Sequence, residues 1–201
     1  MFSVLFLSSV SAQEVEEERE FDYLANSGKG PKHWGELKKE WSSCKSGNLQ
    51  SPVDMSNSRV KVINKPVDLK VKYKPCAALL KNRGHDISIR WPNCDAGSIV
   101  INGTEYALQQ AHWHSPSEHT INGISLAVEL HMVHQNKENK KMAVIGVLYN
   151  YGAPNDFLSK VGSVSKDQAH ALRVAVHDYA EQNARPVQPL NDRQVELYSP
   201  N

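Results

Sequence analysis

Three histidines whose spacing suits a metal ion lie in the middle of the sequence. His112 and His114 are two residues apart, so on a β-strand both side chains leave the same face of the sheet. His131 lies in a second alternating segment, where it shares one face with Glu129 and Val133. If the two segments are neighbours, three imidazoles converge, and three neutral imidazoles with a fourth position left to water form a catalytic zinc site. Such a zinc ion lowers the pKa of bound water to about 7 and supplies hydroxide at neutral pH.

Two other interpretations fit these residues. A His-x-His pair on a strand is more often an exposed or hydrogen-bonded pair than a metal site, although the Glu118 and Glu129 carboxylates nearby are of the kind that orients ligand imidazoles. His112-x-His114 followed by Glu118 also matches the start of a cupin motif, in which Glu118 is itself a ligand on a jelly-roll barrel. Cupins have a Pro-x-Gly turn before the later histidine, and none precedes His131. A cupin-like metalloprotein is therefore a minor alternative.

The composition is typical of one soluble globular domain. The chain has 201 residues, 40% of them hydrophobic and 22% charged, with 23 Lys+Arg against 22 Asp+Glu. The net charge of +1 supplies no strong field for nucleic acid or an anionic membrane, so we expect neither as a partner. No apolar run approaches the roughly 18 residues that a membrane span needs. The composition does not indicate an oligomeric state.

Strands must position the histidines, because period-two alternation dominates from residue 60 to residue 149. Asn-Gly pairs at 102–103 and 122–123 predict tight turns, so 108–115 and 125–134 are expected to be separate strands. Residues 143–149 are nearly all apolar and indicate a strand covered on both faces. Other alternating segments, whose apolar residues we assign to the core, are 69–73, 87–91 and 99–101.

One clear helix is predicted, late in the chain. Ser165 and Gln168 form a capping box, which marks a helix N-terminus. Apolar residues then recur at helical spacing: Ala169, Leu172, Val176 and Tyr179. The pattern as a whole predicts a mostly β single domain with few helices.

The N-terminus resembles a secretory signal peptide, which we assign to residues 1–12. Residues 1–10 are a short apolar run and Ala12 suits signal peptidase, although the run lacks a positively charged start; the alternative is a buried strand. Residues 13–20 are expected to be an acidic, solvated spacer. Asn102-Gly103-Thr104 is a glycosylation sequon, which also favours the secretory route.

The three cysteines, Cys44, Cys76 and Cys94, are an odd number, so at least one thiol has no partner within the chain. None of them belongs to a C-x-x-C pair, so a cysteine zinc site or a thioredoxin motif is not indicated.

Several motifs, in order, resemble the α-class carbonic anhydrases, plant members in particular. The central motifs are QAHWHSPSEHT at 110–120 and AVELHMVH at 127–134, flanked by GPKHWG at 30–35, QSPVD at 50–54 and RPVQPL at 185–190. The resemblance runs from about Phe21 to Tyr198. It implies one domain over 21–198 with a central, mainly antiparallel, twisted sheet and a few short peripheral helices.

The resemblance also implies a role for individual residues in the hydration of carbon dioxide to bicarbonate and a proton. His112, His114 and His131 would hold Zn²⁺, with Gln110 and Glu129 as their hydrogen-bonding partners. His85 falls at the position of a solvent-reaching proton shuttle, for which an imidazole is suited. Glu118 would help to orient the hydroxide, and Val133 and Val144 would line the apolar side of the site, where carbon dioxide docks.

The chain departs from the family after the strand at 143–149. A Thr-Thr-Pro-Pro segment and the apolar strand after it are missing, because 157–160 runs directly into 161–165. We therefore expect an internal deletion near residues 160–161, which leaves the domain incomplete in its C-terminal third. The missing part also carries the family's partner for the cysteine at the Cys44 position, so Cys44 is expected to be unpaired.

The predicted deletion bears on function. The missing threonine would hold the attacking hydroxide, and losing one such hydrogen bond can cost roughly 10²–10³ in rate, so weakened turnover is expected. A non-catalytic binding or storage protein on the same scaffold is the alternative. The resemblance further implies a secretory destination: extracellular or cell wall, with vacuole or plastid as other possibilities.

Overall fold

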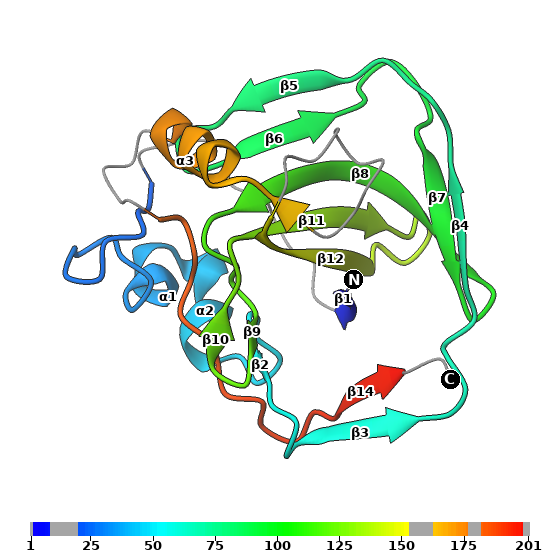
Figure 1. Cartoon of the computed structure of the whole chain (residues 1–201), viewed down its shortest axis with the longest axis horizontal. Coiled ribbons are helices and arrows are strands. Elements are labelled where there is room, and N and C mark those ends of the chain that lie inside the picture. The colour runs from blue at the N-terminus through cyan, green and yellow to red at the C-terminus, as the bar shows by residue number, and fades with distance from the viewer. Residues whose placement is uncertain (1, 9–19, 153–162, 177–181, 199–201) are drawn as a thin grey trace.

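A curled, mainly antiparallel sheet of nine strands forms the centre of the computed structural model, which describes residues 2–8, 20–152, 163–176 and 182–198 (Figure 1). Its main path runs β1-β12-β11-β8-β6-β5, while β7 pairs with β8 and β4 pairs with β7. A short strand, β13, pairs with the end of β12. The strands of this sheet are β1 (Phe2–Ser8), β4 (Leu69–Tyr73), β5 (Leu79–Asn82), β6 (Ile87–Arg90), β7 (Gly97–Ile101), β8 (Thr104–His114), β11 (Val128–Gln135), β12 (Met142–Tyr151) and β13 (Ser163–Val164).

Smaller elements surround this sheet. One small sheet holds β2 (Asp54–Met55), β9 (Thr120–Ile121) and β10 (Ile124–Ser125), and a parallel pair holds β3 (Val60–Ile63) and β14 (Val195–Tyr198). The helical segments are α1 (Trp34–Leu37), the 3-10 turn η1 (Lys39–Trp41), α2 (Ser43–Ser46) and α3 (Lys166–Ala175). The mostly β fold with a few short peripheral helices is therefore confirmed.

Both Asn-Gly pairs form tight turns. Asn102 and Gly103 have φ values of 48° and 82°, and Asn122 and Gly123 have values of 52° and 77°. Two successive residues with positive φ match the twist of a hairpin and favour Asn-Gly. The first turn joins β7 to β8 as predicted. The second closes the short β9–β10 hairpin, so the two long strands β8 and β11 are separated by more than a single turn.

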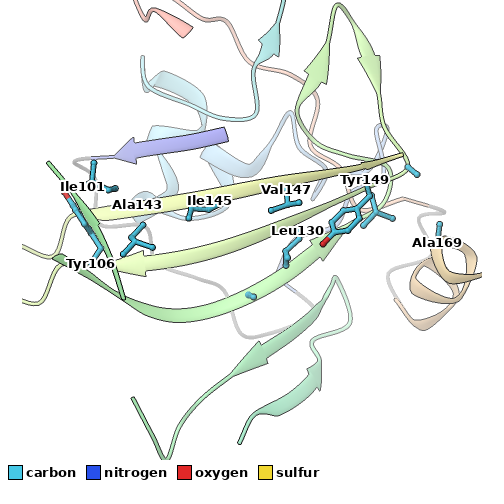
Figure 2. Close-up of a cluster of buried hydrophobic side chains, with 12 residues drawn as sticks. Ile101, Tyr106, Leu130, Ala143, Ile145, Val147, Tyr149 and Ala169 are labelled. Carbon is cyan, nitrogen blue, oxygen red and sulfur yellow. The ribbon is translucent and has the colours of Figure 1, made fainter. Parts of the chain in front are cut away.

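The hydrophobic core lies on β7, β8, β11 and β12 (Figure 2). β12 is covered on both faces between Met142 and Tyr149, as its continuous apolar sequence predicts. The assignment of β4 to the core is wrong, because Val71 is 55% exposed and Leu69 and Tyr73 are also exposed. The physical reason is that β4 is an edge strand, which among the described residues pairs with β7 alone.

Helix α3 begins at the predicted capping box. The Ser165 hydroxyl accepts a hydrogen bond from the Gln168 amide at 3.1 Å, and the Gln168 side chain accepts one from the Ser165 amide at 3.0 Å. The helix ends at Ala175, because Val176 has an extended backbone with ψ of 128°. The expected continuation through Val176 is therefore wrong, and Tyr179 lies outside the described residues.

The N-terminal residues Phe2–Ser8 form β1, which pairs antiparallel with β12. A strand is the alternative that the sequence left open for this segment, and the signal-peptide boundary at residue 12 stays a prediction. Of the predicted acidic spacer, the structure describes Glu20 alone, and the predicted junction near residues 160–161 lies outside the described residues. No helix in the described part of the chain is long and apolar enough to cross a membrane.

The cysteines divide into a pair and a free thiol. Cys76 is disulfide-bonded to Cys94, which joins the segments on either side of the β5–β6 hairpin. Cys44 is free, as the resemblance implied.

Candidate metal centre

Strands β8 and β11 bring the three predicted ligands together. They pair antiparallel with His131 opposite His112, and Glu129 opposite His114. The ring centroids are 5.0 Å apart for His112 and His114, 5.2 Å for His112 and His131, and 4.8 Å for His114 and His131. One nitrogen from each ring lies within 4.8 Å of the other two, so the three rings can hold one metal ion.

Each of the three imidazoles has a hydrogen-bond partner that fixes which nitrogen remains for a metal. His112 Nδ1 lies 3.0 Å from Gln110 Oε1, His114 Nδ1 lies 2.6 Å from the Asn183 carbonyl oxygen, and His131 Nε2 lies 2.8 Å from Glu129 Oε1. Since all three partners are acceptors, these nitrogens carry the protons. The lone pairs of His112 Nε2, His114 Nε2 and His131 Nδ1 are then available.

The residues fit a bound zinc ion. His114 Nε2 is buried and makes no hydrogen bond, which is costly for a polar atom unless a ligand satisfies it. Burial, followed by the charges of His114 and His131, holds the pKa of His112 well below its usual range, so this ring is neutral at neutral pH. Three neutral imidazole nitrogens are a zinc donor set with a position left open.

Glu129 supports two histidines at once. Its Oε1 accepts hydrogen bonds from His131 and from His119 Nδ1, which lies 2.7 Å away, while Oε2 accepts from the His119 amide at 2.9 Å. Burial opposes the ionisation of Glu129, but the two histidines outweigh it, and its pKa is held well below the usual range. Sequence reasoning identified Glu129 and missed His119, although His119 lies within the central motif at 110–120.

Residues 183–185, which we name the C-terminal strap, are distant from the histidines in sequence but form hydrogen bonds with residues of the metal centre. Besides the Asn183 carbonyl on His114, the Arg185 amide donates to Glu118 Oε1 at 2.8 Å. The Asn183 side chain accepts from the Ser115 amide at 2.8 Å and donates to the carbonyls of His85 and Trp113, both at 3.0 Å. Sequence reasoning missed Asn183, although it lies two residues before the RPVQPL motif.

Glu118 lies beside the three histidines without completing their set. Its Oε2 is 3.6 Å from His114 Nε2. Two close groups of possible ligand atoms lie among the described residues, one formed by His112, His114 and His131 and one by His119, Glu129 and His131. Neither group includes Glu118. The geometry therefore does not favour Glu118 as a metal ligand, which the cupin alternative requires.

His85 is placed differently from the prediction. The residue is 5% exposed and its ring centroid lies 4.9 Å from that of Phe21, so the expected solvent-reaching position is wrong. The reason is that Phe21, which also contacts Trp34 and Trp41, packs against the imidazole, while the Asn183 side chain donates a hydrogen bond to the His85 carbonyl. Burial also lowers the pKa of His85.

The structure also places the remaining predicted site residues, Val133, Val144 and Asn102. Val133 and Val144 face each other across β11 and β12, two residues beyond His131 on the same face. The β8–β11 register shifts between Val133 and His134, so the regular face ends there. Asn102 is exposed in its turn, away from the metal centre.

Comparisons with known proteins agree with the family resemblance of the sequence motifs. The sequence profile described as eukaryotic-type carbonic anhydrase matches residues 29–164. The chain belongs to this family. Alpha carbonic anhydrase 7 of Arabidopsis thaliana is 42% identical over 258 residues, covering 100% of this chain and 93% of the relative. Carbonic anhydrase Nec1 of Nesocodon mauritianus is 42% identical, covering 94% of this chain and 89% of the relative.

Solved structures of related proteins share the fold. A carbonic anhydrase from Thermovibrio ammonificans superposes with a TM-score of 0.74 at 26% identity, covering 88% of this chain and 98% of that one. Dioscorin, in a structure described as a complex with ascorbate, superposes with a TM-score of 0.79 at 29% identity, covering 88% and 96%. As a carbonic anhydrase by family, the chain is not a cupin, and the family implies carbon dioxide and bicarbonate as the small-molecule substrate pair.

Proposed function

We propose that this carbonic anhydrase homologue binds Zn²⁺ through His112, His114 and His131 and hydrates carbon dioxide more slowly than complete family members. The observation that carries the proposal is the convergence of three imidazoles whose other nitrogens are already hydrogen-bonded. When bound by three neutral imidazoles, zinc lowers the pKa of a coordinated water to about 7 and supplies the nucleophile at neutral pH.

The protein's own residues orient the site. Gln110, Glu129 and the Asn183 carbonyl hold the three rings so that their free nitrogens converge, and such partners typically contribute 10–100-fold to metal affinity. Val133 and Val144 offer an apolar wall next to His131, which suits carbon dioxide because it is uncharged.

Two observations support weakened turnover. Glu118 receives a hydrogen bond from the Arg185 amide, but no serine or threonine hydroxyl of the described residues donates to it. The alignment with Arabidopsis alpha carbonic anhydrase 7 extends over 258 residues, more than the 201 residues of this chain. Both agree with the loss of the segment that would carry an orienting threonine, and losing one such group costs roughly 10²–10³ in rate.

The test uses the full chain. We expect one zinc per chain by elemental analysis, and stopped-flow hydration of carbon dioxide roughly 10²–10³ slower than a complete plant relative measured alongside. His131→Ala should lose both the zinc and the hydration, while Gln109→Ala, at an exposed position on the same sheet, should lose neither. Full zinc occupancy with a rate equal to that of the relative would contradict the weakening.

The likeness to dioscorin favours one second candidate, a binding protein without turnover. We test it with ascorbate, the ligand in the description of that structure, by calorimetry on the full chain. Ascorbate binding together with no hydration above the buffer rate supports the binding protein. Hydration that disappears in His131→Ala supports the enzyme.

We further propose that the chain enters the secretory pathway, on the strength of its apolar N-terminus and the exposed sequon at Asn102. Expression in plant cells should give a protein whose mass falls on glycosidase treatment. Asn102→Gln should remove this shift, and an unshifted native protein would count against the proposal.

A further inference from the structure

The turn that carries the sequon borders a hollow on the surface of the protein. Asn102 and Gly103 form the β7–β8 turn, and the Asn102 backbone amide donates a hydrogen bond to the Asp68 carbonyl oxygen at 3.0 Å. A shallow hollow of about 720 Å³ is lined by residues 61–68, Asn102 and Glu196. It lies where the β3–β14 pair approaches the ends of β4 and β7 (Figure 1). Its volume is within the range of roughly 300–1,000 Å³ that is typical of ligand sites.

Asn102 is accessible at the edge of this hollow. The residue is exposed, and a Cβ atom placed on Gly103 meets no atom beyond its chain neighbours within 4 Å, so the turn is open to solvent. An Asn-x-Thr sequence in such a turn is an acceptor for an N-linked glycan in a chain that enters the secretory pathway. A glycan attached there begins at the rim of the hollow.

The lining of the hollow has the chemistry that a sugar matches. It includes two exposed apolar side chains, Val62 at 62% and Val67 at 38% exposure, together with the charged side chains of Lys61, Lys65 and Glu196. A pyranose ring has an apolar face of C–H groups and an edge of hydroxyls, and N-acetylglucosamine adds a methyl group and an amide. An exposed apolar patch bordered by polar groups is typical of an interaction surface.

The chain beneath the hollow has little cover of its own. Residues 64–68 are all exposed and belong to no helix or strand. Contacts between a single sugar and a shallow surface are weak when the sugar is free in solution. A sugar tethered at Asn102 is held beside the surface, so the same contacts form within one molecule at a high effective concentration. The attached glycan is therefore favoured over a free saccharide as the occupant.

We propose that the first sugars of an N-linked glycan on Asn102 lie in this hollow against Val62 and Val67 and hold residues 61–68 to the end of the central sheet. The inference rests on the secretory route of the proposed function. It does not depend on zinc or on turnover, because the lining of the hollow shares no residue with the metal centre.

Stepwise removal of the glycan tests this placement on the full chain, secreted by plant cells whose glycans are kept in the high-mannose form. An endoglycosidase leaves the first N-acetylglucosamine on Asn102, whereas a peptide amidase removes the whole glycan. We expect the trimmed protein to keep its melting temperature. Complete removal should lower the melting temperature by roughly 2–4 °C, a shift that weak contacts can give in a domain of this size, and should speed hydrogen exchange in residues 61–68. Asn102→Gln, which has neither glycan nor new charge, should match the fully deglycosylated protein.

The second Asn-Gly turn provides a matched control. Asn122 and Gly123 have the same positive φ values, Ile124 is 65% exposed, and none of the three lines the hollow. Asn102→Gln/Ile124→Thr therefore moves the sequon to a similar turn, where removing the glycan should change neither melting nor exchange in residues 61–68. If the glycan at Asn122 protects as well as the one at Asn102, the hollow is not the cause and the inference fails.

A lining residue gives the last comparison. Val67→Ser should reduce the effect of glycan removal at least by half, while Val71→Ser, at an exposed position outside the hollow, should leave it unchanged. Each variant is compared with its own deglycosylated form, so a loss of stability in the fold itself cancels. A glycosylated native chain that is unaffected by complete removal overturns this inference and leaves secretory entry standing. A chain that carries no glycan contradicts both.

Discussion

Glu129 is fully buried and accepts hydrogen bonds from both His119 and His131. Glu129→Gln keeps the size of the side chain but replaces one acceptor oxygen with a donor. If the amide nitrogen takes the Oε1 place, both rings lose their acceptor; if it takes the Oε2 place, the His119 backbone amide faces a donor. We expect zinc affinity to fall about 10–100-fold in competition with a chelator, because a ligand imidazole is then less firmly held.

The matched control is Glu138→Gln, an exposed carboxylate beyond the end of β11. It should leave zinc affinity unchanged. If Glu129→Gln binds zinc as tightly as the native chain, the hydrogen bond from His131 does not orient the ligand, and our account of the centre is wrong at this residue.

His134 makes stability depend on pH. It is fully buried, with Nε2 2.9 Å from the Tyr73 hydroxyl and Nδ1 3.2 Å from the Ala143 carbonyl oxygen, and burial lowers its pKa to about 4. In the unfolded chain its pKa is about 6.5, so the unfolded state binds the proton first as the pH falls. The neutral His134 ring therefore makes its full contribution to the free energy of unfolding above pH 6.5. This contribution, up to about 3 kcal/mol, is lost as the pH falls from 6.5 to 4.

Urea unfolding at pH 7.5 and pH 4.5 checks this prediction, with His134→Gln as the comparison. Acidic groups titrate in both proteins, so the difference between them isolates His134. The native chain should lose about 2–3 kcal/mol more than the variant on acidification. An equal loss in the two proteins would mean that folding does not lower the pKa of His134.

At the scale of single elements, helix α3 depends on its N-cap residue, Ser165. Ser165 and Gln168 satisfy each other's backbone amides, and Arg173 then ties the helix to the sheet through Ser115 and Tyr151. Ser165→Ala leaves a helix-start amide without its partner and should lower the free energy of unfolding by about 1 kcal/mol. Urea denaturation measures it, with exposed His170→Ala as a control expected within about 0.5 kcal/mol of the native chain. Equal midpoints for the two variants would show that the cap does not contribute.

Elements with a strong local signal were predictable from the sequence. The capping box placed the start of α3, the Asn-Gly pairs placed two turns, and the uncharged apolar run placed β12. Burial was less predictable, because alternation states which residues share a face but not whether another layer covers it. β4 alternates as expected and still leaves Val71 exposed. The end of α3 was missed because Val176 continues the apolar spacing while its backbone is already extended.

At the scale of the whole molecule, the three histidines of the site were predictable from the sequence, but the long-range contacts around them were not. The two-residue spacing of His112 and His114 and the alternation around His131 indicated one face and one meeting point. The contacts made by Asn183 and by Phe21 could not be found that way, because they join segments far apart in sequence: Asn183 is 69 residues from the ring it holds. Phe21 covers His85 across a similar distance, which is why the predicted exposure of His85 was wrong.

The C-terminal strap has a consequence for the order of events during synthesis. His112, His114 and His131 leave the ribosome well before Asn183 and Arg185, which complete the hydrogen bonds to His114 and Glu118. A nascent chain can therefore gather all three ligands while one of them still turns freely. Since coupling between two events is reciprocal, the docking of the strap strengthens metal capture, and captured metal strengthens the docking. If the centre binds zinc as we propose, the C-terminal strap, which is synthesised after all three ligands, thus decides when the metal centre is complete.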